Sequence, residues 1–129
     1  MEIGATKAVQ DRLKTTKIEE SKGASLAFCW DTHLTKIKGR NVLFIVNASN
    51  RYTIAMTDIE PRNWNYYTMY ISRVIHGVMQ EMGYSEKQIG QYFKMSGDTT
   101  VTKTHGKKAV GDNIQRDEAK RNRAEEGRK

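Results

Sequence analysis

The stretch that most constrains the fold is residues 42–54, VLFIVNASNRYTI. It opens with the densest run of large apolar residues in the chain, is interrupted by a polar break, and resumes with β-branched and aromatic residues. Two such runs across a short break containing Asn and Ser are typical of a β-hairpin. The stretch therefore predicts two neighbouring antiparallel strands, and it indicates no reaction.

The residues before this hairpin alternate in the manner of a strand. From residue 24 onward one side of the predicted strand holds Leu26, Phe28, Trp30 and Leu34, and the other holds Ala27, Cys29, Asp31 and His33. The sequence KGRN at 38–41 favours a turn back into the hairpin. Strands that follow one another through short connections usually pair, so we expect a three-stranded antiparallel meander.

Helical and further strand patterns flank the meander. Residues 61–82 begin with Pro61 and repeat apolar side chains every three or four residues, which predicts one long amphipathic helix. Ser85 and Gln88 form a capping box that opens a shorter helix, and a first short helix follows Thr6. Residues 1–5 and 99–104 are expected to be edge strands.

Together these patterns predict an α+β fold. We expect an antiparallel sheet of four or five strands, with the long helix packed on one face and shorter helices beside it. Residues 1–114 form one domain in this interpretation. Residues 115–129 contain no aliphatic residue larger than alanine, so they are expected to be an exposed helix or a disordered charged tail.

The charge of the chain points to an acidic partner. The 22 Lys and Arg residues outnumber the 15 Asp and Glu residues, giving a net charge of +7 that is weighted toward the second half. Such a balance favours nucleic acid or an acidic protein surface. The single Cys29 cannot form an intrachain disulfide, and neither a membrane span nor a signal peptide is evident, so a cytoplasmic location is expected.

Motifs for catalysis or metal binding are not found. His33, His76 and His105 are far apart and lack zinc-finger or HExxH spacing, so we expect no metal and no cofactor. Cys29, Asp31 and His33 share a strand face, but such neighbours lie about 7 Å apart, too far for direct hydrogen bonds. The sequence therefore favours a binding protein over an enzyme.

Two groups of residues are candidates for partner contacts. The candidate nucleic-acid contacts are Lys103, His105, Lys107 and Lys108, around the loop at Gly106, and Arg116, Arg121 and Arg123 in the tail. The tail arginines alternate with acidic residues, which also suits a solvated helix. On the long helix, Tyr66, Tyr70 and Arg73 are spaced i, i+4, i+7 off the apolar stripe, as in a protein-interface anchor, or else lie under neighbouring strands.

Several motifs resemble a bacterial family of unknown function. They are Thr6-Lys7, the run CWDTHL at 29–34, the strand-turn-strand at 42–54, and Thr102-Lys103-Thr104. The resemblance covers residues 1–114 in order, and residues after Ile114 depart from the family pattern. It implies an occurrence in bacteria and in their phages or plasmids, and it implies no activity.

The turn at the end of the hairpin is the most recognisable part of that pattern. Asn47 and Asn50 also suit turn geometry, whereas Arg51 has no such structural reason to be there. If the family shares a site, the rim of this turn is where we expect it, with Trp30 and His33 on the neighbouring strand.

The leading hypothesis is a small basic accessory protein that acts by binding a nucleic acid or nucleoprotein. One version is an anti-CRISPR-like inhibitor of a nucleic-acid-guided defence nuclease. The alternatives are a small nucleic-acid-processing enzyme using His33 or His105, and a protein-protein adaptor anchored on Tyr66, Tyr70 and Arg73.

Overall fold

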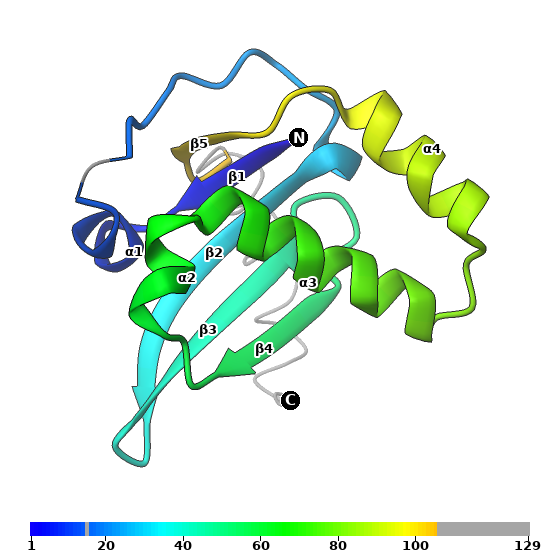
Figure 1. Ribbon diagram of the computed structural model, residues 1–129. Helices are drawn as coiled ribbons and strands as arrows, with labels where there is room; N and C mark the ends of the chain where they lie inside the picture. The colour runs from blue at the N-terminus through cyan, green and yellow to red at the C-terminus, as the bar shows by residue number, and fades with distance from the viewer. Residues whose placement is uncertain (15, 106–129) are drawn as a thin grey trace, which may run out of the picture.

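The computed structural model describes residues 1–14 and 16–105 (Figure 1). Their elements are, in chain order, β1 (Glu2–Ala5), α1 (Lys7–Arg12), the 3-10 turn η1 (Leu26–Phe28), β2 (Cys29–Ile37), β3 (Arg40–Asn47), β4 (Thr53–Thr57), α2 (Pro61–Asn65), α3 (Tyr67–Glu81), α4 (Glu86–Ser96) and β5 (Thr100–Lys103). The predicted α+β class is confirmed. The expected tail at 115–129 lies outside the described residues.

The five described strands form one mixed sheet in the order β4-β3-β2-β1-β5. Strands β2, β3 and β4 form the predicted antiparallel meander, with Leu34 opposite Leu43 and Ile45 opposite Ile54. The expectation of a wholly antiparallel sheet is wrong, because β1 lies between β2 and β5 and pairs in parallel with both. Residues 1–5 are thus an interior strand and not an edge strand.

The sequence conceals this interior position for a physical reason. A parallel strand covered on both faces usually reads as a continuous apolar run. All four residues of β1 are buried, yet only Ile3 and Ala5 join the hydrophobic core. Glu2 and Gly4 point to the other face, where polar groups cover them.

Strand β2 is shorter at its start than the alternating pattern predicts. It begins at Cys29, and Leu26 and Phe28 belong instead to the 3-10 turn η1. The Phe28 ring packs against Tyr92 of α4, with ring centroids 5.1 Å apart. A side chain outside the strand thereby anchors α4 to the start of β2.

Helices α2 and α3 replace the single helix expected at 61–82. The chain leaves helical geometry at Tyr66, with φ −121° and ψ 50°. On either side of this break, the rings of Trp64 and Tyr67 stack 5.4 Å apart and nearly parallel, and both are buried. Helix α3 crosses one face of the sheet (Figure 1), where Ile71 and Ile75 enter the core.

The capping box predicted for the next helix is present, since Ser85 accepts a hydrogen bond from the Gln88 backbone N–H and the Gln88 side chain accepts one from Ser85. Among the described helices, none has the length and apolarity that crossing a membrane requires.

Gly4 is a position where the fold has no room for a side chain. A Cβ there would lie 2.0 Å from Asp31 Oδ1 and 2.9 Å from the Thr104 Cα. We predict that Gly4→Ala lowers the free energy of unfolding by about 1–3 kcal/mol, because the backbone after β5 must move away. Urea denaturation followed by circular dichroism measures this loss.

The matched control is Gly77→Ala in α3, where nothing lies within 4 Å of the added methyl group. Alanine favours a helix over glycine by about 0.5–1 kcal/mol, so this variant is expected to be more stable than the parent. Equal effects at both positions would contradict the close packing at Gly4.

Candidate functional site

Three strand segments bring polar side chains together on the sheet face opposite α3. Residues of adjacent parallel strands that are in register share a face, so Glu2 and Gly4 of β1 lie beside Cys29 and Asp31 of β2. The chain after β5 then crosses over Gly4 and places His105 above them. We call Glu2, Cys29, Asp31 and His105 the buried polar cluster.

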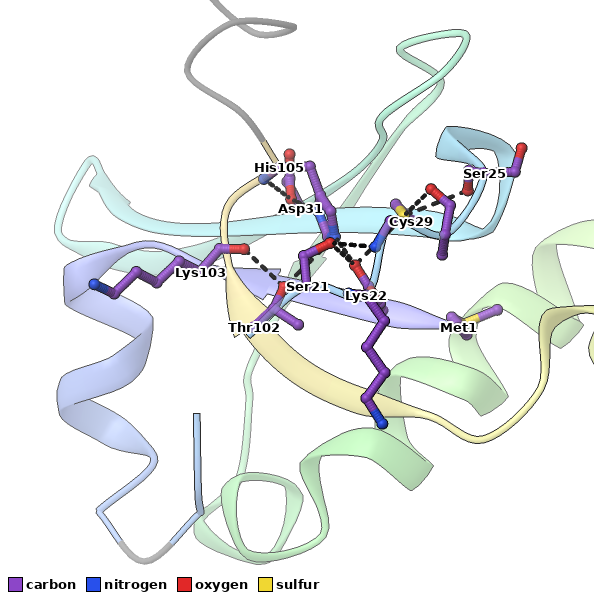
Figure 2. Close-up of polar contacts among 12 residues, drawn as sticks. Met1, Ser21, Lys22, Ser25, Cys29, Asp31, Thr102, Lys103 and His105 are labelled. Carbon is purple, nitrogen blue, oxygen red and sulfur yellow. Dashed lines mark hydrogen bonds and ion pairs between the residues drawn. The ribbon is translucent and has the colours of Figure 1, made fainter. Parts of the chain in front are cut away.

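The ring of His105 lies between the carboxylates of Asp31 and Glu2, and Figure 2 shows Asp31 and His105 close together. Its Nδ1 is 2.6 Å from Asp31 Oδ1, and its Nε2 is 2.8 Å from Glu2 Oε1. The His105 backbone N–H also donates to Asp31 Oδ1 at 3.0 Å. All three residues are at most 9% exposed.

A loop closes the cluster from outside. Glu19 donates its backbone N–H to the carbonyl of Val101 in β5, at 2.7 Å. Two residues later Ser21 Oγ donates to Glu2 Oε1 at 2.7 Å, and the Lys22 backbone N–H donates to Glu2 Oε2 at 2.8 Å. Both oxygens of Glu2 are therefore satisfied.

The geometry requires a charged imidazole. A carboxylate oxygen accepts hydrogen bonds, so each ring nitrogen must donate, and only the imidazolium carries two N–H groups. Burial alone lowers the pKa of His105, but the hydrogen bonds and charges of Asp31 and Glu2 outweigh burial and raise it. Burial likewise disfavours ionised Glu2, yet the donors Lys22 N, Ser21 and His105 bring the pKa of Glu2 below its usual value.

Cys29 completes the cluster as a thiol that is protonated at neutral pH. Its Sγ lies 3.9 Å from Glu2 Oε1 and 3.4 Å from the Ser25 carbonyl, and the residue is 0% exposed. Burial, followed by the charges of Glu2 and Asp31, raises the pKa of Cys29 to about 11. A thiol with so little thiolate at neutral pH is a poor nucleophile.

The same side chains offer metal-binding atoms. One carboxylate oxygen of Glu2, Sγ of Cys29 and one ring nitrogen of His105 lie within 4.8 Å of one another. The sequence did not reveal this group, because its members are separated by up to 103 positions. The alternation of Cys29 and Asp31 was a partial signal, but nothing local indicates that Glu2 or His105 lies beside them.

The candidate nucleic-acid residues are divided by the structure. Lys103 is exposed on β5, whereas the His105 ring is buried in the polar cluster and is not presented to a phosphate. The two residues therefore do not form one exposed loop. Lys107, Lys108, Arg116, Arg121 and Arg123 lie outside the described residues.

The candidate residues at the hairpin turn have internal roles. Asn47 Oδ1 accepts hydrogen bonds from the backbone N–H groups of Ser49 and Asn50. The Asn50 side chain accepts one from Tyr52 N–H at 2.9 Å, and Arg51 adopts a positive φ of 65°. These bonds support the structural interpretation of both asparagines.

Trp30 and His33 lie on opposite faces of β2. Trp30 is buried in the core, and its indole N–H donates to the Tyr92 hydroxyl at 3.0 Å. His33 is exposed on the other face. The turn, Trp30 and His33 therefore do not converge on one surface.

A different surface of the molecule is open to a partner. We call Tyr66, Met69, Tyr70 and Arg73 the α3 ridge. Tyr66 is 66% and Met69 51% exposed, Arg73 is exposed, and Tyr70 is half-buried against the core. The ridge borders two hollows of about 320 and 370 Å³, and Met69 and Arg73 line both.

Comparison with known proteins identifies the family to which this chain is similar. The model of the family described as "Domain of unknown function (DUF6933)" matches residues 2–116, a span that includes the buried polar cluster and the α3 ridge. Searches of curated proteins and of solved structures found no match.

Removing the imidazole tests whether it holds the cluster together. We predict that His105→Ala lowers the free energy of unfolding by about 3–5 kcal/mol, because two buried carboxylates lose their counter-charge. Urea denaturation at neutral pH measures the loss.

His76→Ala is the matched control. His76 also pairs with a carboxylate, Glu86 at 3.0 Å, but this pair is exposed to solvent. We expect little change in stability there, because water solvates the separated partners. Similar losses of unfolding free energy in the two variants would contradict the claim that the buried His105 ring stabilises the fold more than the exposed His76 ring does.

Proposed function

We propose that this chain, which belongs to the DUF6933 family of domains of unknown function, acts by binding an acidic protein surface through the α3 ridge. One observation carries the proposal: Tyr66, just before α3, and Met69 and Arg73 of α3 are exposed and line one hollow together, and Met69 and Arg73 also line a second.

The composition of the ridge suits a binding hot spot. Tyr, Met and Arg are enriched in protein interfaces, and the residues that dominate binding energy insert into or surround pockets. The first hollow lies between α3 and α4 and is lined by Ser72, His76, Ile89 and Phe93 among others. The second is lined by Arg62, Asn63, Tyr66 and Tyr70. A partner side chain can enter either hollow while its backbone crosses the ridge.

Charge indicates what the partner presents to Arg73. The exposed arginines Arg40 and Arg62 are paired with Asp58 and Glu60. Among the ion pairs of the described residues, Arg73 has no such partner. Its guanidinium, flanked by apolar side chains and both hollows, suits two parallel hydrogen bonds to a carboxylate. The net charge of +7 favours encounter with an acidic surface.

The positions of the histidines favour binding over catalysis. The ring of His105 is occupied by two carboxylates and is buried away from any substrate. His33 is exposed, and none of the ion pairs among the described residues involves its ring. We therefore propose that the chain is not an enzyme.

The nucleic-acid hypothesis remains a prediction for the basic residues beyond position 105. It includes the version in which the chain inhibits a nucleic-acid-guided nuclease. Of its candidate contacts, Lys103 is the one that the structure describes as exposed. The experiment below separates that hypothesis from a protein interface.

Tyr66→Ala and Arg73→Ala are predicted to weaken partner binding at least tenfold each, as truncated hot-spot residues do. The tagged full chain captures partners from a lysate of its source cells, with and without nuclease, and mass spectrometry quantifies them. We expect one protein that survives nuclease treatment and is lost with both variants.

Tyr52→Ala is the control, since Tyr52 is also an exposed tyrosine (40%) but lies in the turn between β3 and β4. It should retain the partner. A partner that disappears with nuclease, or that dissociates steeply as salt rises, would instead support nucleic-acid binding and overturn the ridge proposal.

A further inference from the structure

We propose that Glu2, Cys29 and His105 form a binding site for a divalent transition metal, with Zn²⁺ the best fit. The site lies on the sheet face opposite α3 and is independent of the α3 ridge. It would join β1, β2 and the segment after β5 around one ion.

The donor atoms are already close to metal-binding geometry. Zinc bonds of about 2.0–2.3 Å place tetrahedral ligands about 3.3–3.7 Å apart. Glu2 Oε1 is 2.8 Å from His105 Nε2 and 3.9 Å from Cys29 Sγ, and the three donors lie within 4.8 Å. The first pair must open by about half an ångström, the second must close by a few tenths, and the donor atoms of Cys29 and His105, which lie within 4.8 Å, must close by up to about one ångström.

Each donor is held in place by a second residue. Asp31 faces Nδ1 of His105 at 2.6 Å, which leaves Nε2 directed at Glu2 and is the carboxylate–histidine–metal arrangement of many zinc sites. Ser21 Oγ and the Lys22 backbone N–H position the two oxygens of Glu2. Figure 2 shows these supports around His105, Asp31 and Cys29.

The cluster is negatively charged and holds a buried polar atom without a partner. Two buried carboxylates share one imidazolium, so one negative charge is unbalanced. Asp31 Oδ2 is buried and has no hydrogen-bond partner among the described residues. A buried charge or polar atom without compensation is costly. Because two protons leave as the ion binds, the metal replaces the Nε2 and thiol protons as the positive charge facing Glu2, and the net charge of the cluster stays the same.

Binding of one metal ion displaces two protons from the cluster. The metal forms bonds to Nε2 of His105, Sγ of Cys29 and Oε1 of Glu2. The Nε2 proton of the imidazolium and the thiol proton leave to solvent, and the Nδ1 proton stays on the hydrogen bond to Asp31. Two protons are released for each ion bound.

The donor set selects among metals. A thiolate and an imidazole suit Zn²⁺ and Co²⁺, whereas Mg²⁺ and Ca²⁺ prefer oxygen ligands alone. The three donors are at most 6% exposed, so the ion would be enclosed by the protein.

Cobalt titration of the full chain tests the site directly. After removal of metals with EDTA, we expect one equivalent of Co²⁺ to produce a thiolate-to-cobalt charge-transfer band, which Zn²⁺ then abolishes. Because Cys29 is the single cysteine, this band reports Cys29 alone. Absence of the band in the folded wild-type chain overturns the proposal. Because this test uses the wild-type chain, it does not depend on whether any variant folds.

Variants assign the remaining roles. Asp31→Asn should keep the band but weaken Zn²⁺ binding about 10–100-fold, measured against a chromophoric chelator, because it perturbs the orientation of His105. Cys29→Ser should remove the band and weaken Zn²⁺ at least tenfold. His76→Ala, which alters the exposed His76–Glu86 pair, should change neither. An unchanged Zn²⁺ affinity in Cys29→Ser, or a loss of the band in His76→Ala, contradicts the site.

Discussion

The imidazolium of His105 between Glu2 and Asp31 is the interaction on which the arrangement of β1 depends. It connects residues 103 and 74 positions apart and joins the first strand, the second strand and the segment after the last. Without it, the parallel pairing of β1 would bury two carboxylates with no cation between them, which proteins rarely tolerate. Gly4 makes the interaction possible, since any side chain there would occupy the space of Asp31 and the Thr104 backbone.

The two faces of the sheet consequently have different tasks. One face packs Ile71 and Ile75 of α3 against apolar strand residues, and this packing fixes which side of α3 faces outward. The outward side is the α3 ridge, so the core determines the geometry of the proposed partner surface. The other face holds a closed polar cluster, which suits charge pairing and metal binding but not contact with a substrate. The proposed binding surface and the stabilising cluster therefore lie on opposite sides of one fold.

Local features of this fold were predictable, and long-range ones were not. The meander follows from short turns at 38–41 and 47–52 and from alternating strands, and the Ser85–Gln88 capping box is a local signal. The parallel insertion of β1 has no such signal, because Glu2 and Gly4 interrupt the apolar pattern of a buried strand. His105 lies among lysines in the sequence, which suggested exposure, and only the path of the chain over Gly4 buries it. The spacing of Tyr66, Tyr70 and Arg73 indicated the ridge, although Tyr66 lies at the break before α3, and the three residues line one hollow.

Nitrogen-15 NMR of the histidine rings in the metal-free full chain is the most direct measurement of the central claim. The account predicts that His105 has two slowly exchanging ring N–H protons, one bonded to each carboxylate, in contrast to exposed His33. Addition of Zn²⁺ should remove the Nε2 proton and retain the Nδ1 proton. A His105 ring that exchanges rapidly with water, or that carries a single N–H before metal is added, would contradict the account.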